Sequence, residues 1–129
     1  ANTIAQNAAI KALQLNNNYF EAIRASLLKR REIVISALSD LEGFDSNFSE
    51  GAFYLFPSIK RFLGKRLNTN EVILNDTNFC MQLLSSENVA TVPGSSFGSK
   101  DSIRISYALS EKDLRTGCKR IKQFCERLI

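Results

Sequence analysis

One glycine-bracketed loop and the extended stretch after it hold the residues best suited to bind a small ligand. Gly94 and Gly98 bracket the loop, and Arg104 stands in the stretch that follows. Its neighbours on the same face of an extended chain, Ser106 and Ala108, are small and leave room beside the guanidinium. A planar guanidinium presents two parallel N–H donors, which match the two oxygens of a carboxylate. The pattern therefore makes Arg104 a candidate carboxylate-binding residue.

The spacing alone leaves another interpretation open. Arg104 could lie on an edge strand and reach into solvent, or pair with a glutamate. The loop also partly resembles a phosphate-binding loop, through Gly94, Gly98 and Lys100. Its spacing is wrong, however, and Asp101 follows the lysine where Ser or Thr is required. A strand rather than a helix is expected next, so the helix N-terminus that would hold phosphate is missing.

The composition excludes several classes of protein and of site. The chain has 129 residues, 44% of them hydrophobic, which fits one globular domain. No apolar stretch approaches the ~20 residues of a membrane helix, and no secretory signal is recognisable. The absence of histidine removes Ser/His/Asp and Cys/His nucleophiles and leaves poor ligands for zinc. Cys80, Cys118 and Cys125 form no CxxC pair, so we expect reduced thiols in a cytoplasmic protein.

The positive charge is spread over the chain. The formal net charge of +4 comes from short basic pairs with acidic residues interspersed among them. This favours solvated helix faces, and we expect no nucleic-acid partner. A basic nucleic-acid-binding domain stays open as the least favoured alternative.

Two helices are expected in the first 43 residues. Thr3 with Gln6 forms a capping-box signature for the first, and Asn18 with Glu21 caps the second. The second helix is about twenty residues long, and Gly43 is placed to end it. Its apolar residues recur at helical spacing, so the helix needs a surface to lie on. They are Phe20, Ile23, Leu27, Val34, Leu38 and Leu41.

Short extended pieces follow. Phe44 and Phe48 flank a possible edge strand, the apolar run 52–56 stops at a proline, and residues 89–92 form a short strand. The basic stretch 58–74 is expected to be mainly loop with one helical turn. Residues 103–109 are the clearest strand, with Ile103, Ile105, Tyr107 and Leu109 on one face.

Two further helices complete the pattern. Asn75 or Asp76 can cap a helix through Phe79, Cys80, Leu83 and Leu84. Ser110 with Asp113 caps the last helix. Its apolar stripe consists of Leu114, Cys118, Ile121, Cys125 and Leu128.

This order of elements predicts an α/β fold: a two-layer small domain with long N-terminal helices and a small mixed β-sheet with helices packed on one side. We divide the chain into a helical region, residues 1–43, and a small α/β domain, residues 44–129.

Three motifs carry a family resemblance. The segments Glu50–Tyr54, Val92–Gly98 and Ile103–Ala108 resemble the C-terminal part of fold-type I PLP-dependent aminotransferases. The opening Asn2–Gln6 also resembles the start of the helix that follows the family's PLP lysine region. The likeness runs along this whole chain, but it covers only the C-terminal domain of the family's chain. It is closest to bacterial aspartate aminotransferases.

The resemblance implies a role for two residues. Arg104 would bind the α-carboxylate of the substrate, and Phe53 would lie near the active-site entrance or pack into the core. The parent enzyme would convert aspartate and 2-oxoglutarate to oxaloacetate and glutamate with pyridoxal 5'-phosphate. Family members are cytoplasmic or organellar homodimers whose active sites lie at the subunit interface, and residues 1–43 would pack at those interfaces.

The chain departs from the family in lacking the PLP lysine. None of its eight lysines has the family's serine-rich context; Lys100 follows Ser99 but precedes Asp101. We therefore assign no catalytic, cofactor-binding or metal-binding residue. The isolated chain, which begins at Ala1 and is expected to be excised or processed, should fold, bind no pyridoxal phosphate and be inactive alone. The main alternative is a carboxylate-binding or regulatory module derived from this fold.

Overall fold

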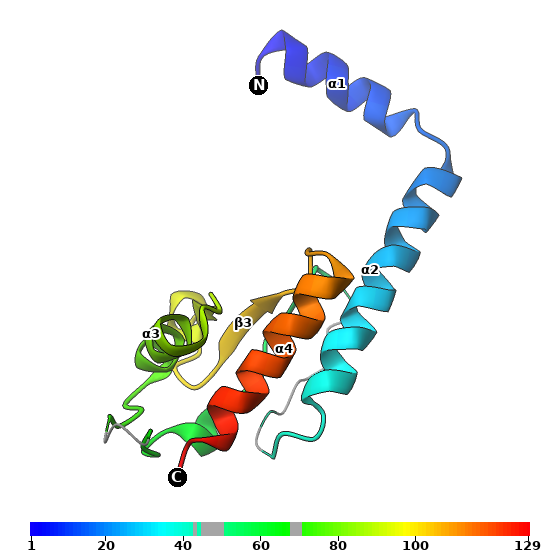
Figure 1. Cartoon of the computed structure of the whole chain (residues 1–129). Helices are drawn as coiled ribbons and strands as arrows, with labels where there is room; N and C mark the ends of the chain where they lie inside the picture. Colours follow the sequence, from blue (N-terminus) through cyan, green and yellow to red (C-terminus); the bar gives the residue numbers. More distant parts are fainter. Residues whose placement is uncertain (43, 45–50, 68–70) are drawn as a thin grey trace.

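The structure, a computed structural model, describes residues 1–42, 44, 51–67 and 71–129 (Figure 1). Helices and short strands alternate along the second half of the chain, after two N-terminal helices. The elements are α1 (Thr3–Leu13), α2 (Asn17–Leu38), β1 (Tyr54–Leu55), the 3-10 helix η1 (Lys60–Phe62), α3 (Asp76–Glu87), β2 (Val92–Pro93), the 3-10 helix η2 (Gly94–Phe97), β3 (Ile103–Ser106) and α4 (Glu111–Glu126).

The α/β class is confirmed, but the pairing within the sheet differs from the mixed sheet expected. The strand order is β1-β3-β2, and both pairs of neighbours are antiparallel. β1 and β2 run in the same direction, but β3 is inserted between them. The short connection from β2 through η2 reverses the chain, so β3 returns antiparallel to both neighbours. Parallel neighbours would have required a longer crossover.

The two faces of β3 divide as its alternating pattern predicts. Ile103 and Ile105 are buried, whereas Ser106 is exposed and Arg104 is half-buried. Strand β3 is shorter than the predicted strand 103–109, because it ends at Ser106. Leu109, predicted on the buried face, is exposed. The buried residues of β3 and the apolar stripe of α4 belong to the same hydrophobic core. Helix α4 lies between α2 and α3 (Figure 1). All five predicted residues of that stripe are buried.

The C-terminal half of α2 belongs to the same core. Ile33, Val34 and Leu38 are buried, and α2 packs along α4. The helix ends at Leu38 with Ser39 as its C-cap. The expected stop at Gly43 is therefore wrong, because the helix ends before it. The residues of the expected strand between 44 and 48 lie outside the described residues, apart from Phe44, which is buried.

Asparagine side chains cap the N-termini of α1, α2 and α3. The predicted capping residues Thr3 and Asn18 lie within helices, because Asn2 and Asn16 cap instead. The Asn2 carboxamide oxygen accepts from Ala5 N–H at 2.8 Å. At α1, asparagine is a better N-cap than the threonine after it, so Asn2 takes the role. At α2, three asparagines follow one another, and the helix begins from the first of them, with Asn16 accepting from Tyr19 N–H. The predictions for Asn75 and Ser110 are confirmed.

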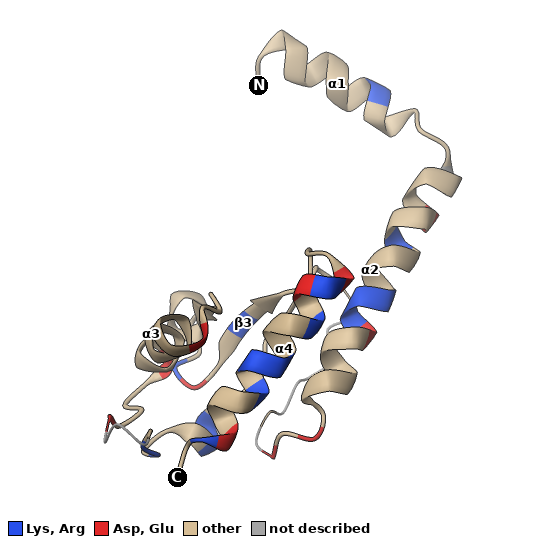
Figure 2. Cartoon of the chain, viewed as in Figure 1, with Lys and Arg blue, Asp and Glu red and all other residues tan. Residues whose placement is uncertain are grey.

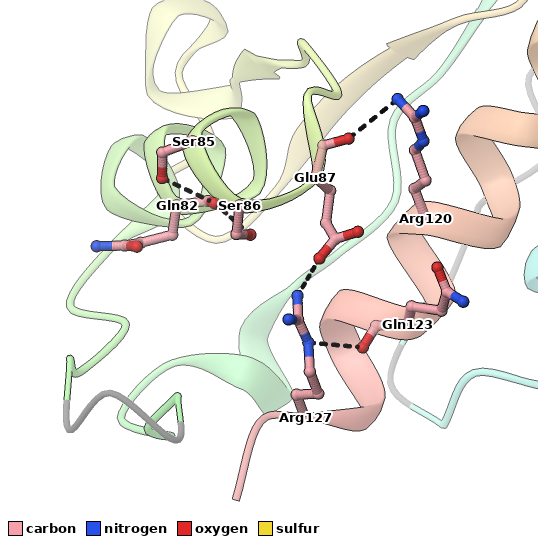
Figure 3. A network of polar contacts seen from close by, with 7 residues as sticks. All are labelled: Gln82, Ser85, Ser86, Glu87, Arg120, Gln123 and Arg127. Atoms are coloured by element: carbon pink, nitrogen blue, oxygen red, sulfur yellow. Dashed lines mark hydrogen bonds and ion pairs between the residues drawn. The ribbon is translucent and has the colours of Figure 1, made fainter.

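A polar network joins the C-terminal ends of α3 and α4 (Figure 3). The Arg127 guanidinium pairs with the Glu87 carboxylate and also donates to the Gln123 carbonyl at 3.3 Å. The Arg120 guanidinium donates to the Glu87 backbone carbonyl at 3.2 Å, which satisfies a carbonyl that the end of α3 leaves unpaired. The Glu87 side chain is only 13% exposed, so the pair fixes the position of α3 against α4.

Basic side chains lie along α4 and α2, with carboxylates among them (Figure 2). Lys29 pairs with Glu111 at 2.7 Å, and Lys122 pairs with Asp40 at 3.7 Å. These two salt bridges link α4 to α2 and to Asp40, which follows α2. They support the interpretation of these charges as solvated helix faces.

Helix α1 and the N-terminal half of α2 extend away from the rest of the chain (Figure 1). Helix α1 contains no buried residue, and its charged residue is Lys11. Eight large apolar side chains of this segment are at least 40% exposed: Ile4, Ile10, Leu13, Leu15, Tyr19, Phe20, Ile23 and Leu28. We call these eight side chains the N-terminal apolar face. Leu27 is half-buried and packs against the core.

The isolated chain is expected to self-associate through the N-terminal apolar face. Apolar surface of this extent is stabilised when another copy covers it. Sedimentation velocity at increasing concentration should show dimers or larger species. The double substitution Phe20→Asp, Ile23→Asp should shift the distribution toward monomer.

Met81→Asp is the matched control, because Met81 is an exposed apolar residue on α3, at 61% exposure. It should leave the distribution unchanged. A strict monomer at high concentration, with slow hydrogen exchange throughout α1 and α2, would contradict the expectation.

Candidate functional site

Arg104 lies on the central strand of the sheet. Val92 of β2 is its direct cross-strand partner, and β1 pairs along the other edge of β3. The interpretation as an edge-strand arginine is therefore wrong. The arginine is half-buried, so its guanidinium is held against the sheet face rather than extended into solvent.

Two aromatic rings cover the guanidinium. Its Cζ lies 4.8 Å from the centre of the Phe97 ring and 5.3 Å from the centre of the Tyr54 ring. Tyr54 is the partner of Ser106 in the register of the sheet, one diagonal position from Arg104. Phe56 packs edge-on against Phe97 with the ring centres 6.1 Å apart. A cation over an aromatic face gains ~0.5–2 kcal/mol, so the rings restrain the plane of the guanidinium.

None of the residues that the structure describes takes up the guanidinium N–H donors of Arg104. Within the part of the chain that the structure describes, no carboxylate pairs with the guanidinium and no oxygen accepts a hydrogen bond from it. The expected alternative of a glutamate partner is therefore not seen among these residues. A guanidinium that contacts two rings and has no acceptor among the described residues is suited to bind a planar anion such as a carboxylate.

The loop after β2 is a tight turn, η2, whose first two residues are held by hydrogen bonds. Gly94 N–H donates to the Ser102 carbonyl at 2.8 Å, and Ser95 N–H donates to the Asp76 carboxylate at 2.6 Å. Gly98 has φ +87°, which favours glycine, and ends the turn. The resemblance to a phosphate-binding loop fails here, because a carboxylate already takes one of the backbone amides and a strand follows.

Asp76 is a buried carboxylate at the first position of α3, only 2% exposed. Desolvation by burial raises its pKa, but hydrogen bonds from Ser95, Thr77 and its own backbone amide together outweigh that effect. Its pKa is therefore below the ordinary value for aspartate. The side chain is charged at neutral pH and bonded to η2.

The first and third motifs meet at Tyr107. The Tyr107 hydroxyl donates to the Ala52 carbonyl at 2.9 Å, and Tyr107 N–H donates to the Phe53 carbonyl at 2.9 Å. Ala52 has φ +64°, an uncommon conformation for a residue with a Cβ, and the tyrosine hydroxyl helps to hold it. The core-packing alternative for Phe53 is wrong, because that side chain is 55% exposed. Its location at an active-site entrance stays a prediction.

The cysteines do not provide a nucleophile. All three are free and buried, and burial raises the pKa of Cys118 to about 11 and that of Cys125 to about 12. Burial also raises the pKa of Cys80. Thiols of this kind carry little thiolate at neutral pH.

Residues 1–42, 44, 51–67 and 71–129 lack two further kinds of feature. No group of three or more His, Cys, Asp or Glu residues in this part of the chain is arranged to hold a metal ion. Likewise, none of its helices combines the length and the hydropathy needed to cross a membrane.

Sequence reasoning found Arg104 but missed the side chains that hold it. Tyr54 lies in the first of the three motifs and Phe97 in the second, but the sequence pattern predicted no role for either side chain. The diagonal position of Tyr54 depends on a register that a single sequence does not reveal. The sequence indicated Asp76 only as a possible helix cap. Asn75 caps the helix instead, which leaves the Asp76 carboxylate able to bind another partner.

Comparison with known proteins identifies the family. The family profile described as "Aminotransferase class I and II" matches residues 1–121. A probable aspartate/prephenate aminotransferase of Rhizobium leguminosarum bv. phaseoli is 42% identical over 125 residues, which are 97% of this chain and 31% of that protein.

Solved structures agree with this assignment. The crystal structure of the aspartate aminotransferase from Rhizobium meliloti matches with a TM-score of 0.91 and 39% identity, over 98% of this chain and 32% of that one. The aromatic aminotransferase from Pyrococcus horikoshii matches with a TM-score of 0.77 and 30% identity, over 94% of this chain and 31% of that one. The chain thus spans about a third of the length of the relatives it matches, and it belongs to the class I and II aminotransferase family.

Proposed function

We propose that this chain is the C-terminal domain of an aspartate aminotransferase and that Arg104 binds the substrate α-carboxylate. The observation that carries the proposal is the guanidinium in contact with the rings of Tyr54 and Phe97, with no acceptor among the described residues. The α-carboxylate is common to every amino acid and 2-oxo acid. An arginine fixed in this way would bind both partners of an amino-group transfer.

Aspartate and 2-oxoglutarate are the substrates that we propose, with oxaloacetate and glutamate as products. The names of the Rhizobium relatives, which include aspartate, support this choice. The similarity to an aromatic aminotransferase agrees with a shared α-carboxylate site. Specificity for the substrate side chain would then depend on residues outside the described site.

The family implies pyridoxal phosphate as the cofactor, and the residues described here do not fit that group by themselves. The eight lysines have exposed side chains, apart from the half-exposed Lys122. None lies in an enclosed site that would hold the cofactor through a lysine. We therefore propose that the rest of the whole protein supplies the cofactor site.

The same proposal extends to assembly and location. The exposed N-terminal apolar face would be covered in the whole enzyme, which we propose to be a homodimer. The division into residues 1–43 and 44–129 stays a proposal within this picture. Three free, buried cysteines support a cytoplasmic location.

The isolated chain is expected to fold and yet bind no pyridoxal phosphate. The reason is that its lysine side chains are exposed, apart from the half-exposed Lys122, and none lies in an enclosed site. The chain should be mixed with pyridoxal phosphate, reduced with borohydride and mapped by mass spectrometry. Sparse labelling spread over several lysines is expected. One stoichiometrically modified lysine, protected by a carboxylate substrate, would contradict the expectation.

The proposed function is tested with the whole protein that contains this chain. Amino transfer should be assayed with aspartate and 2-oxoglutarate, and then with aromatic amino acids in place of aspartate. Transfer from aspartate with the higher kcat/KM supports the proposal. A whole protein that binds these carboxylates but transfers no amino group would instead be the carboxylate-binding or regulatory module. Transfer confined to aromatic substrates would overturn the choice of aspartate.

A further inference from the structure

We propose that Asp76 is a positioning residue for Arg104, acting through the η2 turn and the ring of Phe97. The inference rests on the proposed function, because it concerns the same carboxylate site. Asp76 is the first residue of α3, and its carboxylate is bonded to the η2 turn. Its effect on Arg104 would therefore pass through that turn.

The first contact in this series is between Asp76 and the turn. The Asp76 carboxylate accepts the Ser95 N–H at 2.6 Å, and the side chain is 2% exposed. A charge-assisted hydrogen bond from a backbone amide to a buried carboxylate is stronger than a neutral one. It fixes the beginning of η2 to the N-terminal end of α3.

The second contact fixes the same turn to the start of β3. Gly94 N–H donates to the Ser102 carbonyl at 2.8 Å, and Ser99 N–H donates to the Gly94 carbonyl at 3.0 Å. The Ser99 hydroxyl also donates to the Ser102 hydroxyl at 2.9 Å. The turn is thus held from two sides, by α3 through Asp76 and by the strand that carries Arg104.

The third contact is between Phe97 and Arg104. Phe97 is the last residue of η2, and its ring centre lies 4.8 Å from the guanidinium carbon. The side chain is 53% exposed, so burial does not set its orientation. Apart from the edge of Phe56, the backbone of the turn determines where this ring lies. Removing the Asp76 contact would therefore let the ring move away from the guanidinium.

If the Phe97 ring moves away, the plane of the Arg104 guanidinium is held less firmly. A bidentate contact with a carboxylate requires the two N–H donors to be held in that plane. The contacts with the rings of Tyr54 and Phe97 restrain that plane. Without Phe97 in place, the arginine keeps its charge but samples more orientations, so carboxylate binding weakens while the later chemistry is little affected.

The test uses steady-state kinetics of the whole protein with aspartate and 2-oxoglutarate. Asp76→Ala is expected to raise KM for both substrates about tenfold and to change kcat less than about twofold, because a uniform loss of binding acts on KM. Asp76→Asn keeps an oxygen that can accept the Ser95 N–H, so KM should return to within about threefold of the unmodified protein. Asp113→Ala removes a carboxylate from the first turn of α4 and is the matched control, with KM unchanged.

A double-mutant cycle decides whether the effect passes through Arg104. The KM effect of Asp76→Ala should disappear in the Arg104→Ala background. Equal effects of Asp76→Ala in both backgrounds would overturn the inference, as would a KM within about twofold of normal. If Arg104→Ala itself leaves kcat/KM unchanged, the proposed function fails first, which separates the two outcomes.

Phe97→Leu provides a second variant at the other end of the series, should Asp76→Ala fold poorly. The exposed side chain at this position can be changed without disturbing the core. Phe97→Leu removes the aromatic face and should raise KM severalfold. No change in KM on this substitution would overturn the inference by itself.

Discussion

Arg104→Ala in the whole protein is expected to lower kcat/KM by roughly thirty- to several-thousand-fold for both the amino acid and the oxo acid. Removing one partner of a desolvated charge pair costs ~2–5 kcal/mol, and about 1.4 kcal/mol corresponds to a factor of ten. Arg104 is half-buried and its guanidinium contacts two rings, which meets the condition of partial desolvation. Both half-reactions should be measured, since each substrate carries the α-carboxylate.

Two further substitutions separate a specific contact from general electrostatics. Arg104→Lys keeps a cation near the rings but loses the planar pair of donors, so it should stay clearly impaired. Lys100→Ala removes an exposed charge from the loop before β3 and should have little effect. A kcat/KM for Arg104→Ala within threefold of the unmodified protein in both half-reactions would show that this arginine is only a solvated surface group.

Gly94→Ala is expected to destabilise the isolated chain by at least about 2 kcal/mol, because overpacking against backbone atoms forces them to shift. A Cβ at this position would lie 2.5 Å from the Ser102 carbonyl oxygen and 2.5 Å from the Ser99 carbonyl oxygen. Both oxygens belong to the backbone of the loop that leads into β3, so neither can turn aside. Urea unfolding followed by circular dichroism measures the loss.

Gly117→Ala is the matched control and should act in the opposite direction. Gly117 lies within α4, and a Cβ built there meets nothing within 4 Å. Alanine is favoured over glycine inside a helix by roughly 0.5–1 kcal/mol, so this variant should be slightly more stable. If Gly94→Ala unfolds at the same urea concentration as the unmodified chain, the close approach of the turn to Ser102 is not a constraint.

The sequence determined the parts of the fold that depend on local chemistry. The alternation of residues in β3 and the apolar stripe of α4 identified which faces are buried, because a strand repeats every two residues and a helix every 3.6. Ser110 and Asn75 were identified as caps from their side-chain chemistry. Arg104 was found because a lone arginine among small residues after a glycine-bracketed loop is a local pattern.

Tertiary structure decided what depends on contacts between distant segments. The antiparallel sheet follows from the insertion of β3 between β1 and β2, which local patterns do not specify. The rings of Tyr54 and Phe97 meet Arg104 only once the register is set, since they come from residues about fifty and seven positions away along the chain. Asp76 reaches Ser95 because α3 folds back beside the turn. A single sequence shows which residues are able to make such contacts. The packing of the chain decides which of them come within hydrogen-bonding distance.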